Sequence, residues 1–211
     1  MYAAVKAKPQ SIEVEHLGPA PMSGPHLVAT YKPGREIYAQ GDLNDKCYQV
    51  STGAVRIHRL LSDGRRQVVS FHLPGEMFGF EAGSNHSFFA EAITETTLAI
   101  FGRRNMQERS RELLALALTG MARAQQHLLV IGRQCAVERI AAFLVDLCER
   151  QGGGRQLRLP MSRQDIADYL GLTIETVSRV VTKLKERSLI ALRDARTIDI
   201  MKPDALRSLC N

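Results

Sequence analysis

The sequence predicts an α+β protein with a β-domain, a long helix and a C-terminal helix-turn-helix with a wing. Three observations lead to this fold class. Short alternating runs separated by glycines fill residues 27–103, a heptad-like apolar repeat fills 104–135, and two short amphipathic helices joined by a glycine lie within 136–211. A chain of 211 residues is long enough for two modest domains, each with its own core.

The β-domain is preceded by a lead-in, residues 1–26, that contains four prolines and no apolar periodicity. We expect this lead-in to be flexible and to carry no function of its own. Residues 27–103 contain runs such as AVRIHRL and QVVSFHL, separated by regularly spaced glycines. Such runs are typical of a sandwich or barrel of antiparallel strands. The pair Asp63-Gly64 predicts a tight hairpin turn because these residue types tolerate positive φ.

Residues 104–135 carry apolar side chains at alternating steps of three and four, which predicts a helix with a coiled-coil seam. The seam either packs on the β-domain of its own chain or pairs with the same helix of a second copy. We favour pairing because a helix of about 25 residues is roughly 30 Å or more in length, which one small domain does not cover. The expected dimer-interface residues are Leu114, Ala117, Met121, Ala124, Leu128, Ile131 and Cys135.

The domain 136–211 begins with a helix that we expect to end at the glycines of 152–154. Ser162 can then cap a further helix, with Asp165 at the capping-box position three residues later. Gly171 supplies a left-handed turn after this helix, and Thr173 can cap the next one. Steps of three and four predict a buried stripe on that last helix, made of Ile174, Val177, Val181 and Leu184.

The opposite face of the last helix carries side chains that suit base edges. Arg179 can donate twice to guanine, Glu175 can accept from cytosine, and Ser178 can do either. Other polar side chains nearby suit phosphates, where they would fix the register on the duplex. These expected phosphate contacts are Arg163, Thr173, Thr182, Lys183 and Lys185. A helical hairpin with a packing role only is the alternative, and the segment 189–201 predicts a β-hairpin wing beside the helices.

Composition excludes several other classes of protein. The net charge of +6 is compatible with nucleic acid, no apolar run is long enough to span a membrane, and the four cysteines lack C-x-x-C spacing. We expect a cytoplasmic protein with reduced thiols, no metal and no cofactor. Cys135 and Cys148 are expected to be buried, whereas Cys210 is a candidate for redox control because chain ends are often exposed. No catalytic triad or phosphate-cradling glycine loop supports an enzyme.

The order of these parts resembles the CRP/FNR family of bacterial transcription regulators over residues 27–202. The motifs that carry the resemblance are GREIYAQGD, STGAVRI and LPGEMFG in the β-domain, AVERIAAFLVDL after the long helix, and SRQDIADYLGLTIETVSRVVTKLKE in the last domain. The resemblance implies a cyclic-nucleotide-binding-like β-barrel, a double-stranded jelly roll, together with a dimerisation helix and a winged helix-turn-helix. It also implies three partners: double-stranded DNA, a second copy and RNA polymerase.

Details of the resemblance favour one branch of the family. Glu175, Ser178 and Arg179 match the E-x-x-S-R signature of FNR-type members, whereas CRP-type members have glycine in place of Ser178 and arginine in place of Ile174. This match implies a palindrome with TTGAT-like half-sites, in which Arg179 reads the guanine. FNR itself holds an iron-sulfur cluster with several N-terminal cysteines, but residues 1–46 contain no cysteine.

The sensor region departs from the cyclic-AMP-binding members as well. Their phosphate-binding Arg-Ser pair is replaced by His86-Ser87, and a neutral histidine is a poor substitute for a guanidinium fork. The chain therefore resembles the FixK branch, which implies an effector-independent activator of genes for low-oxygen respiration, denitrification or nitrogen fixation. A regulator that responds to a small molecule, such as a cyclic nucleotide, or to a redox signal is the alternative.

Overall fold

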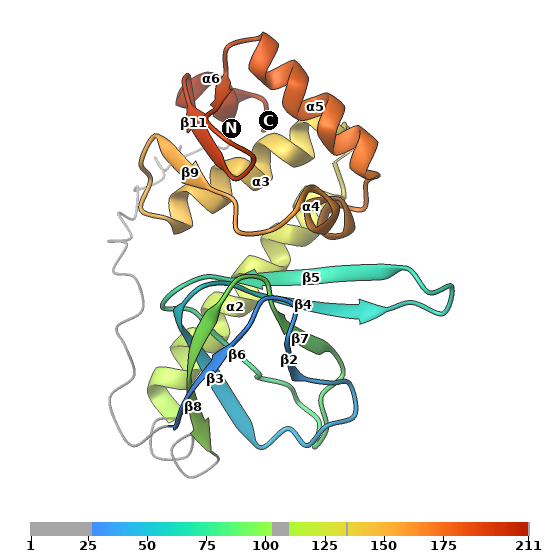
Figure 1. Cartoon of the computed structure of the whole chain (residues 1–211), viewed down its shortest axis with the longest axis vertical. Helices are drawn as coiled ribbons and strands as arrows, with labels where there is room; N and C mark the ends of the chain where they lie inside the picture. Colours follow the sequence, from blue (N-terminus) through green and yellow to red (C-terminus); the bar gives the residue numbers. More distant parts are fainter. Residues whose placement is uncertain (1–26, 103–109, 134, 211) are drawn as a thin grey trace, which may run out of the picture.

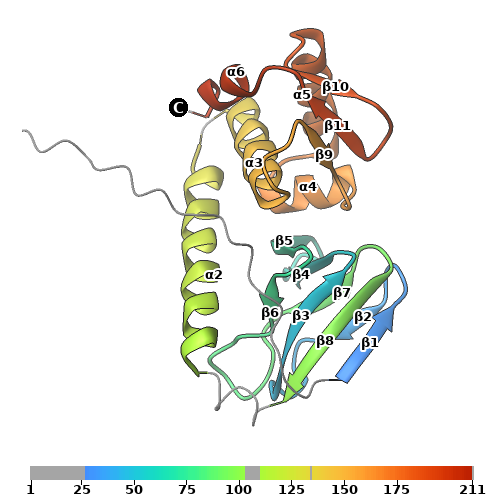
Figure 2. The ribbon, with the colours of Figure 1, turned by 90° about the vertical axis from the view of Figure 1, so that its left-hand side faces the viewer.

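The computed structural model of the protein describes residues 27–102, 110–133 and 135–210. The predicted lead-in, 1–26, lies outside these residues. The β-domain and the C-terminal domain lie one above the other, and the long helix α2 runs alongside the β-domain towards the C-terminal domain (Figures 1 and 2).

The β-domain consists of two four-stranded antiparallel sheets, with strand orders β1-β8-β3-β6 and β2-β7-β4-β5. Hydrophobic side chains from both sheets, including Val50, Val55 and Leu98, form its core. The strands are β1 (Leu27–Tyr31), β2 (Glu36–Tyr38), β3 (Lys46–Thr52), β4 (Val55–Leu60), β5 (Arg66–His72), β6 (Met77–Phe78), β7 (Phe89–Ala92) and β8 (Thr96–Gly102).

Two turns of the β-domain depend on glycine. The predicted hairpin at Asp63-Gly64 is confirmed: Gly64 has a φ of 80°, and the turn joins β4 to β5. Gly53 has a φ of 88°, and a Cβ atom there would lie 2.4 Å from the carbonyl oxygen of Glu95. Any larger residue at position 53 would therefore force the β3–β4 turn away from β8.

Helix α2 (Ser110–Ile131) packs on the β-domain along one side only. Leu113 contacts the cluster around Cys47 and Phe101, and Val130 is buried where the two domains meet. The helix ends at Ile131, and Cys135 is an exposed residue with extended backbone that precedes α3. The predictions that Cys135 continues the helical seam and that its thiol is buried are therefore wrong, because the chain leaves the helix at Gly132.

The C-terminal domain packs its helices around a three-stranded sheet of order β10-β11-β9. Its core includes Leu144, Leu157, Leu170, Leu184 and Ile198. The elements are α3 (Ala136–Arg150), β9 (Gln156–Arg158), α4 (Arg163–Leu170), α5 (Ile174–Glu186), β10 (Ile190–Leu192), β11 (Thr197–Ile200) and α6 (Pro203–Ser208).

The two domains share a continuous contact. Phe71 and Leu73 of the β-domain belong to the same hydrophobic cluster as the core of the C-terminal domain. Beside it, the Arg150 guanidinium donates to the buried carboxylate of Glu76, with Nη2 2.7 Å from Oε2 and Nε 3.0 Å from Oε1. Burial alone would raise the pKa of Glu76, but its hydrogen bonds to Arg150 lower the pKa below its usual value. The carboxylate therefore stays charged and paired within this contact.

Candidate nucleic-acid interface

Helix α4 begins with the predicted capping box. The Ser162 hydroxyl accepts from the backbone N–H of Asp165, and the Asp165 carboxylate accepts in return from the backbone N–H of Ser162. Ile166, Ala167 and Leu170 are buried as expected. Gly171 ends the helix with a φ of 63° and a ψ of 42°, which is the left-handed conformation that the sharp turn requires. The turn brings α5 across α4.

Helix α5 begins at the predicted cap, Thr173, whose hydroxyl accepts from the backbone N–H of Thr176 at 3.2 Å. The buried residues of α5 are Val177, Val180, Val181 and Leu184. Ile174 is 38% exposed, so its predicted place in the buried stripe is wrong. It stands in the first turn of the helix, and Val180 is buried instead.

The three predicted base-reading residues lie on the outer face of α5, which forms an outer edge of the C-terminal domain (Figure 1). Glu175 and Arg179 are exposed, whereas Ser178 is half-buried and its hydroxyl accepts from Arg163 of α4 at 3.2 Å. A hydrogen bond from its own backbone N–H, and then one to Thr173, lower the pKa of Glu175. The face therefore offers a guanidinium, a carboxylate that stays charged, and a hydroxyl within two turns of helix.

All five predicted phosphate contacts are exposed. Arg163 and Thr173 stand at the beginnings of α4 and α5, whereas Lys183 and Lys185 lie in the last turn of α5. The Thr182 hydroxyl is engaged within the helix, since it donates to the backbone oxygen of Ser178 at 3.0 Å. Cationic side chains thus stand near both ends of the reading face.

Two polar residues beside this face, Thr176 and Arg196, were not predicted from the sequence as part of the interface. The Thr176 hydroxyl accepts from Arg179 at 3.4 Å, so it steadies the guanidinium. Arg196 lies exposed in the turn of the β10–β11 hairpin, which confirms the predicted wing. The signal for Arg196 was a basic residue two positions after Asp194, whose carboxylate accepts from the Arg196 backbone N–H at 2.7 Å.

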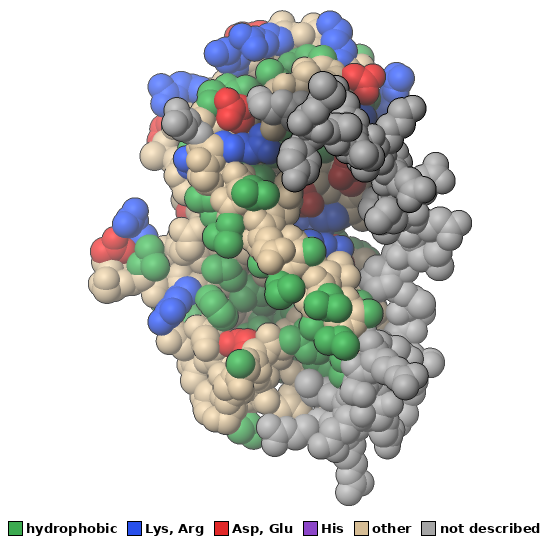
Figure 3. All heavy atoms as spheres, turned by 180° about the vertical axis from the view of Figure 1, so that it is seen from behind, with side chains coloured by type: hydrophobic (Ala, Val, Ile, Leu, Met, Phe, Trp, Pro, Cys, Tyr) green, Lys and Arg blue, Asp and Glu red, His purple; other side chains and the backbone are tan. Residues whose placement is uncertain are grey.

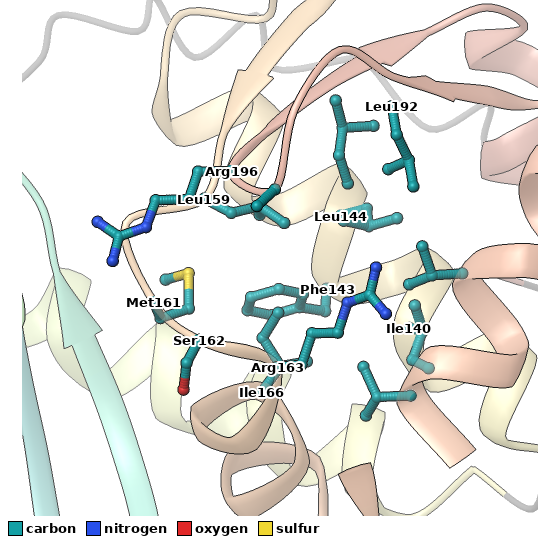
Figure 4. Close-up of a pocket in the computed structure, with 14 residues that line it drawn as sticks. Ile140, Phe143, Leu144, Leu159, Met161, Ser162, Arg163, Ile166, Leu192 and Arg196 are labelled. Carbon is teal, nitrogen blue, oxygen red and sulfur yellow. The ribbon is translucent and has the colours of Figure 1, made fainter. Parts of the chain in front are cut away.

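A cavity of about 320 Å³ lies behind α5, between α3, α4 and the wing (Figure 4). Its walls are mostly apolar side chains such as Phe143, Leu159 and Met161, and its charged lining residues are Arg163 and Arg196. Side chains of the buried face of α5 and side chains of the wing therefore both line this cavity. The volume is at the lower end of the range usual for ligand pockets, and the lining includes no carboxylate.

The β-domain region that corresponds to the cyclic-nucleotide site is occupied by internal contacts. Nδ1 of His86 lies 2.8 Å from Oε1 of Glu81, and the backbone N–H of Ser87 donates to the same carboxylate at 2.5 Å. The His86 ring stacks on Tyr38, and the rings of Tyr38, Tyr48 and Phe78 cluster in the interior. Nδ1 of His86 and the Glu81 carboxylate are thus paired with each other, whereas Nε2 of His86 is buried without a hydrogen-bond partner among the described residues.

The outward face of α2 is apolar (Figure 3). Five large hydrophobic side chains on it are more than half exposed, although such residues are usually buried. They are Leu114, Leu118, Met121, Leu128 and Leu129. Ala117 and Ala124 are also exposed, and Ile131 is half-buried. Leu118 and Leu129 lie outside the predicted seam, so the apolar face is wider than the seam and extends to one side of it.

In the described part of the chain, the cysteines, histidines and carboxylates do not support a metal site or a redox site. Burial raises the pKa of Cys210, which lowers its thiolate content, so the candidate redox role gains no support. Within the described ranges, no three His, Cys, Asp or Glu side chains are grouped as metal ligands would be. No helix in the described part of the chain has the length and apolar character needed to cross a bilayer.

Comparisons with known protein families agree with both domains. Residues 28–111 match the model of the cyclic nucleotide-binding domain, and residues 138–209 match that of the Crp-like helix-turn-helix domain. The nitrogen fixation regulation protein FixK of Rhizobium meliloti strain 1021 is 98% identical over 211 residues, all of both chains. The chain belongs to the CRP/FNR family of transcription regulators, in its FixK branch.

Other members of the family support this assignment. FixK of Azorhizobium caulinodans is 42% identical over 193 residues, which are 86% of this chain and 78% of the relative. The solved structure of FixK2 from Bradyrhizobium japonicum is 39% identical, with a TM-score of 0.83, and the match covers 88% of this chain and 98% of that one. The predicted family and fold class are thus confirmed, and the similar proteins are named as regulators rather than enzymes.

Proposed function

We propose that the protein is a homodimeric transcription activator that reads a palindrome with TTGAT-like half-sites. The observation that carries this proposal is the outer face of α5, where Glu175, Ser178 and Arg179 stand together while Val177 and Leu184 hold the helix from behind. A guanidinium in this position can donate to both acceptors of a guanine, and a carboxylate can accept from cytosine. The roles of these side chains follow from their chemistry and from the E-x-x-S-R signature.

Dimerisation would pair the outward faces of two α2 helices. That face includes five hydrophobic side chains that are more than half exposed, a pattern that marks interaction surfaces. Pairing would bury them and place two copies of α5 on one side of the dimer. Two such helices enter successive major grooves when they lie about 34 Å apart.

We further propose that the regulated genes serve nitrogen fixation or other low-oxygen metabolism, because the FixK relatives are named nitrogen fixation regulation proteins. Activation would occur by recruitment of RNA polymerase to promoters that carry the palindrome. Transcription in vitro from such a promoter, with and without the protein, measures this step directly.

Effector independence is the third part of the proposal. His86, Tyr38 and Glu81 contact one another where a cyclic-nucleotide regulator would hold its ligand. The competing function is a regulator whose DNA affinity depends on a cyclic nucleotide, and the match to the cyclic nucleotide-binding domain model is the observation in its favour.

One experiment tests the proposal. Purified protein is titrated in air against a pool of randomised palindromes, with and without cyclic AMP and cyclic GMP, and the bound DNA is sequenced. We expect enrichment of TTGAT-like half-sites without any added nucleotide. Enrichment of an unrelated sequence would disprove the reading assignment, and dependence on a nucleotide would establish the competing function.

A further inference from the structure

The β4–β5 hairpin of the β-domain holds helix α4 of the DNA-binding domain through charged groups. Nη1 of Arg56 lies 2.9 Å from Oδ1 of Asp165, and Nη2 of Arg66 lies 2.6 Å from the same oxygen. Arg66 also pairs with Asp168, one turn further along α4, with Nη2 2.7 Å from Oδ2. We call these four residues, Arg56, Arg66, Asp165 and Asp168, the interdomain clasp.

Both halves of the clasp are fixed within their own domains. Nη2 of Arg56 lies 2.6 Å from Oε1 of Glu91 on the neighbouring strand β7, so its guanidinium bridges the sheet and α4. Asp165 is 2% exposed, and its other oxygen, Oδ2, accepts from the Ser162 backbone N–H and hydroxyl in the capping box. The Asp165 carboxylate therefore both completes the N-terminal capping box of α4 and attaches this helix to the β-domain.

A backbone contact strengthens this attachment. The side-chain amide of Gln67, next to Arg66 on β5, donates to the backbone oxygen of Asp168 at 2.7 Å. Residues of the β4–β5 hairpin thus contact α4 at its first turn, at Asp165, and again one turn later, at Asp168. Two attachment points on one short helix restrict its rotation as well as its translation.

The position of α4 determines that of the reading helix. The two helices pack through their buried faces, and Arg163 of α4 donates to Ser178 of α5. The β-domain in turn carries α2, the proposed dimer helix. A rigid link from the β-domain to α4 therefore fixes where each α5 stands relative to the axis of the dimer.

We propose that Arg56 and Arg66 are positioning residues for DNA recognition: through the clasp they set the separation and orientation of the two reading helices, and hence the half-site spacing that the dimer accepts. The proposal rests on the proposed function, and it extends that function by assigning part of the site preference to residues of the β-domain. The contacts that Glu175, Ser178 and Arg179 would make with the bases of one half-site do not depend on the clasp.

The test compares Arg66→Ala with the parent on palindromes whose central spacer is lengthened or shortened by one or two base pairs. We expect the parent to bind one spacing more tightly than the others. In the variant, this ratio of affinities should be about tenfold smaller, because a buried charge pair that loses one partner no longer holds its helix. Discrimination at the guanine of each half-site should stay within about twofold of the parent.

Arg65→Ala is the matched control, since Arg65 lies on the same hairpin but is exposed and pairs with Asp63 there. Arg66→Lys, which keeps a positive charge beside Asp165 and Asp168, should retain most of the spacing preference. An unchanged preference in Arg66→Ala overturns the proposal, and so does an equal loss on every DNA, which indicates general unfolding.

A second measurement separates this proposal from the proposed function. Hydrogen exchange of the α4 amides should be faster in Arg66→Ala than in Arg65→Ala, whether or not DNA is present. If the parent selects no palindrome, the proposed function fails while the exchange result still decides whether the clasp holds α4. Equal exchange in the two variants overturns the clasp.

Discussion

The imidazole ring of His86 lies flat against the phenol ring of Tyr38, with centroids 3.6 Å apart and planes inclined by 7°. Nδ1 of the same ring lies 2.8 Å from Oε1 of Glu81. His86 stands where cyclic-AMP-binding relatives have a phosphate-binding arginine, but here its ring packs against side chains in the interior of the domain. The stack and the hydrogen bond to Glu81 thus hold the His86 ring in the interior of the β-domain.

We predict that His86→Ala lowers the free energy of unfolding by about 1 to 3 kcal/mol, because the stack is lost and the Glu81 carboxylate loses a buried partner. Urea unfolding followed by circular dichroism measures this loss. Ser84→Ala, on the exposed part of the same loop, is the control and should stay within about 0.5 kcal/mol of the parent. Equal values for both variants would show that the stack has no structural role.

Local signals in the sequence predicted the helix-turn-helix well. Ser162 with Asp165, the left-handed Gly171 and the cap at Thr173 are contacts between residues that are close along the chain, so their spacing alone indicates them. The same reasoning misplaced Ile174 and Cys135. Burial of the first depends on which side chains pack beside the first turn of α5, and helical continuity of the second depends on where α2 ends.

Long-range contacts could not be predicted in this way. Arg66 and Asp165 are 99 residues apart, and each resembles an ordinary surface charge in its own segment. Asp165 was expected as a capping residue only, and its second role appears once the β4–β5 hairpin is placed against α4. Similarly, the width of the apolar face on α2 depends on which side of that helix the β-domain covers.

The reading face yields a specific prediction for DNA affinity. Arg179→Ala should weaken binding to a TTGAT palindrome by about 1 to 3 kcal/mol and should relax discrimination at the guanine, since a bidentate contact is lost. Lys183→Ala is the comparison, because loss of a phosphate contact should weaken binding to all sequences about equally. Gel-shift titrations against the palindrome and its guanine variants measure both. Unchanged affinity of Arg179→Ala would disprove its assigned role.

The apolar face of α2 yields a prediction for assembly. Leu128 is 68% exposed in the single chain, and Leu128→Glu would place a charge in the proposed dimer interface. We expect this variant to be a monomer at micromolar concentration and to bind the palindrome at least about tenfold more weakly. Sedimentation equilibrium measures the assembly. Gln126→Glu, exposed on the same helix away from the seam, should remain dimeric, and a dimeric Leu128→Glu would exclude this interface.

His127 of α2 links stability to pH. Its ring stacks on Tyr169 of α4, with centroids 3.8 Å apart, and burial lowers its pKa from 6.5 to about 4. The unfolded chain therefore binds a proton at His127 at a higher pH than the folded chain does. The stability contributed by the neutral ring is fully present above about pH 6.5 and is lost as the pH falls towards 4.

We predict that His127→Phe, which keeps an aromatic ring against Tyr169 but cannot be protonated, reduces the loss of stability between pH 6.5 and 4. Urea unfolding of the parent and the variant across this range measures the difference in slope. His72, whose pKa burial also lowers to about 4, is present in both proteins and contributes equally to both slopes. Parallel slopes in the two proteins would mean that His127 titrates alike in the folded and unfolded chains.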